Sequence, residues 1–147
     1  MAGYSGTPLA KKLGIAEGSV VAVLGAPPGF VDRLGETLPA TAAVRTRAAG
    51  TADVVVSFHT GRAHLEGRVP ALVRTLDVDG GLWIAWPKRA SGVPTDVTED
   101  TVREVFLPLG LVDNRVCAID ETWSGLRVVW RKELRAERRA LGAQPVR

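Results

Sequence analysis

Three short runs of consecutive apolar residues divide the chain, and each is bounded by glycine, proline or a polar residue. They cover residues 20–24, 53–58 and 82–86. Such runs lack the alternation of a half-exposed strand and are typical of strands covered on both faces of a parallel sheet. The pattern therefore predicts the central strands of an α/β fold.

Helical patterns separate these runs. Residues 61–76 place apolar side chains at helical spacing, although Pro70 should kink or weaken the first half. A short helix is predicted over residues 8–13, with Thr7 as its cap, Pro8 at its first position and Gly14 ending it. Further helices are expected at residues 30–38, at residues 98–107 after a cap at Asp96 or Thr98, and in the charged segment 133–143.

The remaining strands complete the predicted sheet. Residues 41–46 form a modest strand candidate, and residues 115–119 and 126–131 are separated by only six residues, which predicts an antiparallel hairpin. A turn is expected at residues 79–81. The sequence thus predicts one three-layer Rossmann-like α/β domain over residues 1–132, with a mostly parallel sheet of about six strands ending in a hairpin. Residues 133–147 form a basic tail, helical or disordered.

Composition agrees with a single folded domain. The 147 residues are 46% hydrophobic and 24% charged, and no apolar run is long enough to span a bilayer or to act as a signal peptide. The single cysteine, Cys117, cannot form an internal disulfide. We therefore expect a cytoplasmic protein.

The net charge of +3 is unevenly distributed. Residues 1–130 contain 13 basic and 14 acidic side chains, whereas residues 131–147 contain six basic and two acidic ones. The body is therefore −1 and the tail +4. Nucleic-acid contact is expected only through the tail, and membrane contact is not expected.

Several segments resemble known families. The strand at residues 20–24, the leucine-rich helix running through Gly80-Gly81 into the next strand, and the terminal hairpin resemble the class I S-adenosylmethionine-dependent methyltransferase fold with one strand missing. Residues 3–15, 86–92 and 120–126 resemble an actinobacterial family of small proteins classed as a domain of unknown function. That second resemblance covers nearly the whole chain and implies no activity.

The methyltransferase resemblance implies a glycine-rich cofactor loop after the first strand and an acid after the second. Here Gly25 and Gly29 flank Pro27-Pro28, which lack two N–H donors, and Arg45 and Arg47 stand near the end of the second strand. We therefore favour a protein without a cofactor that binds a small anionic ligand or a protein partner without catalysis. The alternative is an S-adenosylmethionine-dependent methyltransferase with a divergent cofactor loop.

Ligands of open α/β sheets bind beyond the carboxyl ends of the strands, so the loops at that edge supply the candidate site. His59 could act as a general base or cap its loop, and Lys88 with Arg89 could clamp an anion or remain solvated. Asp120 could face the cleft or pair with Lys88 or Arg89, and Trp123 could stack on a ligand or cover the core. The candidate ligand-binding residues are Gly25, Gly29, His59, Lys88, Arg89, Ser91, Asp120 and Trp123.

No metal site is expected, because His64 follows His59 by five residues and misses the spacing that lets two histidines chelate from one helix face. The chain also has no Gly-x-Ser-x-Gly elbow and no phosphate-binding P-loop, which leaves hydrolase and nucleoside-triphosphatase readings without support.

Overall fold

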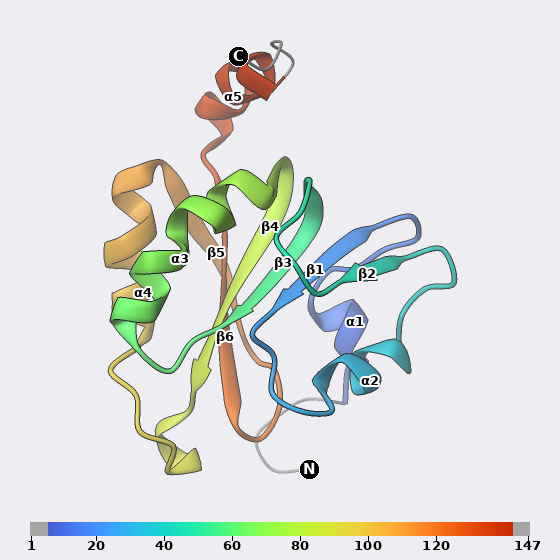
Figure 1. Ribbon diagram of the computed structural model, residues 1–147, viewed down its shortest axis with the longest axis vertical. Helices are drawn as coiled ribbons and strands as arrows, with labels where there is room; N and C mark the ends of the chain where they lie inside the picture. Colours follow the sequence, from blue (N-terminus) through green and yellow to red (C-terminus); the bar gives the residue numbers. More distant parts are fainter. Residues whose placement is uncertain (1–5, 143–147) are drawn as a thin grey trace.

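A six-stranded sheet lies between two layers of helices in the computed structural model, which describes residues 6–142 (Figure 1). The strands are β1 (Val20–Leu24), β2 (Ala43–Arg45), β3 (Ala52–Phe58), β4 (Leu76–Pro87), β5 (Leu111–Ala118) and β6 (Trp123–Trp130). The helices are α1 (Leu9–Lys12), α2 (Phe30–Gly35), α3 (Arg62–Thr75), α4 (Glu99–Phe106) and α5 (Lys132–Gly142), with short 3-10 turns at Arg89–Ser91 and Leu107–Leu109.

The strand order is β2-β1-β3-β4-β6-β5. Strands β2, β1, β3 and β4 are parallel, and β6 runs antiparallel to both β4 and β5. The predicted fold class, a mostly parallel Rossmann-like sheet ending in an antiparallel hairpin, is confirmed.

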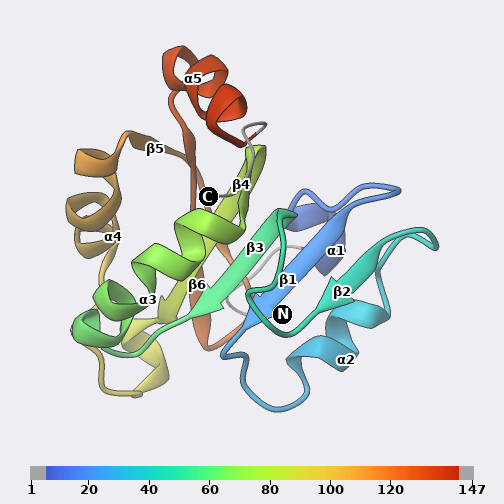
Figure 2. The same cartoon turned by 45° about the horizontal axis from the view of Figure 1, so that its top comes forward.

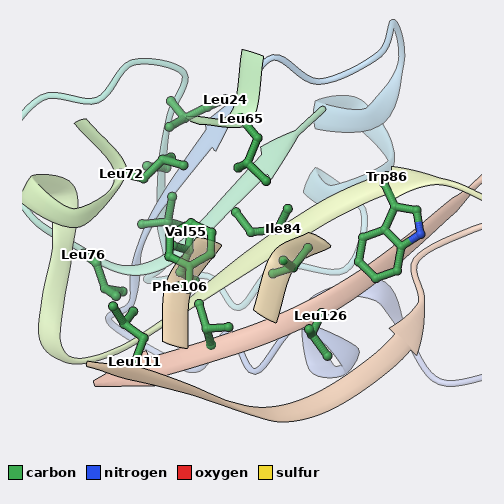
Figure 3. Packing of buried hydrophobic residues seen from close by; sticks show 14 of the residues in the cluster. Leu24, Val55, Leu65, Leu72, Leu76, Ile84, Trp86, Phe106, Leu111 and Leu126 are labelled. Carbon is green, nitrogen blue, oxygen red and sulfur yellow. The ribbon is translucent and has the colours of Figure 1, made fainter. Parts of the chain in front are cut away.

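Both faces of the sheet are buried, which explains the apolar runs without alternation. Val55, Ile84 and Leu126 point toward α3 and α4, where they pack with Leu72 and Phe106 (Figure 3). On the other face, Val56 and Trp83 pack with residues of α1 and α2. The Trp83 indole N–H also donates to the Leu13 carbonyl at 3.0 Å, which ties the N-terminal segment to the sheet.

The predicted turn at residues 79–81 is wrong, because Gly80 and Gly81 lie inside the 12-residue strand β4. A Cβ atom at Gly80 would lie 2.5 Å from the Asp53 carbonyl oxygen, and one at Gly81 would lie 2.2 Å from Nε of Arg127. The two glycines therefore leave room for a neighbouring strand and for a side chain that crosses the sheet.

Two helix starts are resolved by the structure. Thr98 caps α4 and forms a reciprocal capping box with Thr101, so Asp96 is not the cap. Pro8, and not the predicted Thr7, is the N-cap residue of α1, so the prediction that Pro8 is the first helical residue is wrong. Gly14 does adopt the predicted left-handed conformation, with φ +80°.

Other boundaries also differ from prediction. Helix α3 is continuous through Pro70, and the hairpin strands begin earlier than expected, at Leu111 and Trp123. The predicted tail helix is α5, while residues 143–147 of the predicted tail lie outside the described residues. Among residues 6–142, no helix combines the length and the apolar character that crossing a membrane requires.

Candidate functional site

The carboxyl ends of the parallel strands meet at one edge of the sheet, where the β5–β6 loop joins them (Figure 2). Backbone hydrogen bonds hold this edge together. The His59 N–H donates to the Ala85 carbonyl at 2.9 Å, and the Lys88 N–H donates to the Thr122 carbonyl at 2.7 Å. All the loops named as candidates from the sequence therefore share this edge.

A cavity of about 390 Å³ opens at the end of β1. Gly25 and Gly29 both line it, with φ of +68° and +85°, a conformation that glycine adopts without strain. The remaining lining residues come from β1, the proline loop, α2 and the residue after β2: Val23, Ala26, Pro27, Pro28, Val31, Asp32 and Thr46.

This cavity lies at the carboxyl end of β1, where open α/β sheets bind ligands. Pro27 and Pro28 have no N–H, and the Phe30 N–H is used by the Pro27 carbonyl at 3.2 Å, so the loop has few donors for a carboxylate. Asp32 and Thr46, however, bring a carboxylate and a hydroxyl to the cavity, groups that can bind ribose hydroxyls.

Asp32 and Thr46 were missed from the sequence. Near the end of the second strand the sequence offers Arg45 and Arg47, but the Arg45 guanidinium donates to the Ala49 and Thr51 carbonyls of its own loop. Their positions in the sequence could have indicated them, because Thr46 directly follows the second strand and Asp32 lies in the first turn of the helix after the proline loop.

A second cavity, of about 400 Å³, lies beyond β4. It contains Arg89 and is bounded by Trp86 and Thr95, among other residues. Ser91 is used within the turn, since its hydroxyl donates to the Lys88 carbonyl at 2.6 Å and accepts from the Val93 N–H at 3.2 Å. Arg89 is therefore the predicted residue of this loop that faces a cavity.

His59 is buried, and both of its ring nitrogens are hydrogen bonded. Nε2 lies 2.6 Å from the Ser57 hydroxyl, and Nδ1 lies 2.8 Å from Nδ1 of His64. Burial, followed by the positive charges of His64 and Arg68, lowers the pKa of His59 to about 4.

A neutral His59 has one ring proton, so it donates to one neighbour and accepts from the other. The three side chains thus form a relay from buried Ser57 to exposed His64, and His64 is the end that solvent reaches. Sequence spacing did not reveal the relay, because His64 lies on α3 and reaches back to the end of β3.

Asp120 and Trp123 have structural partners. Oδ1 of Asp120 accepts from the N–H groups of Thr122 and Trp123, each at 2.8 Å, and Oδ2 pairs with Arg33 at 3.1 Å. Asp120 thus pairs with Arg33 of α2, a partner that was not predicted from the sequence.

Trp123 is the first residue of β6, so the prediction that it lies in a loop is wrong. Its ring meets Phe58 edge to face, with centroids 5.0 Å apart, so it covers the core. The eight predicted residues accordingly share one edge of the sheet, but they divide between two cavities, a buried relay and packing contacts.

Across residues 6–142, no group of three or more His, Cys, Asp or Glu side chains is arranged to hold a metal ion.

Comparisons with known proteins concern the fold. No family model matches the sequence, and no curated protein is similar to it in sequence. The resemblance to the actinobacterial family of unknown function therefore stays a prediction.

Solved structures do match. An S-adenosylmethionine-dependent methyltransferase from Aquifex aeolicus superposes with a TM-score of 0.62 at 16% identity, covering 82% of this chain and 86% of that one. Ribosomal protein L11 methylase from Lactobacillus delbrueckii subsp. bulgaricus gives 0.58 at 11%, covering 84% and 75%. A putative type 11 methyltransferase from Sulfolobus solfataricus gives 0.57 at 11%, covering 84% and 90%. The chain therefore has the Rossmann-like fold of the S-adenosylmethionine-dependent methyltransferases.

Proposed function

We propose that the chain is an S-adenosylmethionine-dependent methyltransferase with a divergent cofactor loop. The observation that carries the proposal is the cavity of about 390 Å³ at the end of β1, lined by Gly25, Gly29, Asp32 and Thr46. Its place agrees with the rule that ligands of open α/β sheets bind outside the carboxyl ends of the strands. The methyltransferase fold of the matched structures gives further support.

Four residues of the cavity have roles in this proposal. The positive φ angles of Gly25 and Gly29 turn the backbone around the ligand, and Asp32 and Thr46 bind the ribose hydroxyls. Bound S-adenosylmethionine supplies an electrophilic methyl group. His64, at the exposed end of the relay, takes the proton of the methyl acceptor, while His59 fixes the orientation of its ring.

The test is equilibrium binding of S-adenosylmethionine and S-adenosylhomocysteine, measured by isothermal titration calorimetry. The wild-type chain should bind both ligands, and Asp32→Ala should weaken binding at least ~10-fold, since a hydrogen bond to a charged group contributes about 1.5–3 kcal/mol. Glu36→Ala is the matched control, because Glu36 is an exposed carboxylate just after the same helix and does not line the cavity. Absence of binding to the wild-type chain at 1 mM of either ligand would overturn the proposal.

A second candidate is non-catalytic binding of a small anionic ligand. The observation that favours it is the Arg89 cavity beyond β4, together with the loss of N–H donors at Pro27 and Pro28. Inorganic phosphate titrated into the protein should then shift the backbone NMR signals around Gly92 and Thr95. Arg89→Gln should abolish those shifts, whereas Arg47→Gln, which removes an exposed cation elsewhere, should leave them intact.

A further inference from the structure

Two arginines face each other on the α1 side of the β5–β6 hairpin. Arg115 and Arg127 are direct register partners across the antiparallel strands. Like charges in this position destabilise a sheet. Within residues 6–142, neither guanidinium takes part in a hydrogen bond or an ion pair with a carboxylate.

Arg127 is also partly withdrawn from water. Its guanidinium crosses β4 where Gly81 has no side chain, and a Cβ there would lie 2.2 Å from Nε and 2.6 Å from Cζ. Burial, followed by the charges of Arg115 and Arg135, lowers the pKa of Arg127. The sheet therefore holds a half-buried cation next to other cations.

Several arginines elsewhere among the described residues pair with carboxylates. Arg33 pairs with Asp120 at 3.1 Å, Arg62 with Glu104 at 2.6 Å, and Arg139 with Asp79 at 2.8 Å. Arg103 contacts three carboxylates. The hairpin pair differs from these, because it sets two guanidinium groups opposite each other without a carboxylate from residues 6–142, an arrangement that an external polyanion would stabilise.

More cations extend the pair in both directions. Toward the carboxyl edge, Lys12 and Lys88 lie near Arg115: burial raises the pKa of the Cys117 thiol, and the charges of these three cations oppose that rise. Nζ of Lys12 also donates to the Ala118 carbonyl at 2.9 Å. Toward α5, Nε of Arg135 donates to the Trp130 carbonyl at 3.1 Å. Figure 1 shows the hairpin running from the carboxyl edge to α5, so the cations follow its length.

We infer that this cationic strip, formed by Lys12, Lys88, Arg115, Arg127 and Arg135, binds the phosphate backbone of nucleic acid. Guanidinium groups match phosphate oxygens with two parallel hydrogen bonds. A row of cations along a sheet face suits a polyanion, whereas a small anion needs a concave site, and Arg127 lines neither cavity at the carboxyl edge. The inference is independent of cofactor binding, because the strip lies on the hairpin and away from β1.

The test is fluorescence anisotropy with labelled 20-nucleotide single-stranded RNA, titrated without cofactor at 50–250 mM NaCl. The wild-type chain should bind, and its affinity should fall as salt rises. Arg115→Gln/Arg127→Gln should weaken binding at least ~10-fold and reduce the log–log salt slope by about 1.4, at about 0.7 for each lost phosphate contact. Arg115→Gln alone, at an exposed position, should show half of that slope change and serves if the double variant fails to fold.

The matched control is Arg47→Gln/Arg74→Gln, which removes the same charge from exposed positions after β2 and on α3. It should bind RNA within about twofold of wild type. An equal loss in this control would overturn the inference, as would failure of the wild-type chain to bind at 50 mM salt. Deletion of residues 136–147 keeps Arg135 and removes the rest of the tail. Loss of binding on this deletion, with binding kept in the hairpin variant, would assign the contact to the tail and overturn the inference. Equal competition by polyglutamate would also contradict a preference for nucleic acid.

Discussion

At the residue scale, the buried histidine relay makes protonation costly. His59 is 2% exposed and lies between Ser57 and His64, and its pKa is lowered to about 4 from a reference value of 6.5. Above pH 6.5 the imidazole is neutral in both the folded and the unfolded chain, so it contributes no pH dependence there. Below that pH the unfolded chain takes up the proton first, which favours unfolding.

We therefore predict that the free energy of unfolding falls as pH drops from 6.5 to about 4. The loss due to His59 approaches about 3 kcal/mol, from a pKa difference of about 2.5 units. Urea denaturation of the wild-type chain and of His59→Gln at pH 7.5, 5.5 and 4.5 measures it. The difference in stability between the two chains should shrink on acidification, and parallel pH profiles would contradict the assignment.

Thr75 is a second residue that lowers the stability of the fold. Its hydroxyl is buried at the end of α3 and has no hydrogen-bond partner among the described residues. Thr75→Val keeps the shape of the side chain and removes the polar group, so it should stabilise the fold by about 1 kcal/mol. Thermal unfolding should show a higher Tm, whereas a lower Tm would indicate that the hydroxyl is satisfied by water.

At the element scale, the apolar runs were enough to identify the central strands and the hairpin, but not their ends. The glycine pair before the third run predicted a turn, because glycine is common in turns, yet its role is to admit the Asp53 carbonyl and the Arg127 side chain. Trp123 was assigned to a loop since polar residues precede it. Both errors arise from contacts between elements distant in sequence, which local patterns do not contain.

Alanine substitution of two glycines should change the stability of the fold in opposite directions. Gly80→Ala should destabilise the fold by about 3 kcal/mol, because the added Cβ would lie 2.5 Å from a backbone oxygen of β3. Gly67→Ala should stabilise it by about 0.5–1 kcal/mol, since Gly67 lies within α3 with open space around its Cα. Chemical denaturation of both variants tests the pair, and similar effects of the two substitutions would refute it.

At the scale of the whole molecule, the sequence placed the candidate loops at one edge of the sheet but not their individual contacts. Gly25, Gly29 and Arg89 line cavities, whereas Asp120 and Trp123 are held by Arg33 and Phe58. These pairings join α2 and β3 to the distant hairpin, so they depend on the assembled layers. The charge count likewise separated the tail from the body without revealing the cations that the hairpin gathers.

The C-terminal helix is an addition to a complete sheet. Its contacts include Arg138 stacked 3.8 Å from the Trp130 ring centroid and the exposed Arg139–Asp79 ion pair. Deletion of residues 133–147 should therefore lower stability by only about 1–2 kcal/mol, chiefly through the stacked arginine. Circular dichroism should show a folded sheet in the shortened chain, and a cooperative loss of all structure would contradict this view.

The two outer strands of the sheet bear on self-association. β2 has only three residues, and β5 is irregular between Asp113 and Arg115, where Asn114 and Arg115 are exposed. A short strand on one side, and a bulged, charged strand on the other, give a second chain little straight backbone on which to add a strand. Arg115, which we assign to phosphate contact, thus also disfavours the addition of a second chain to this edge. Its replacement should therefore lower solubility as well as nucleic-acid binding.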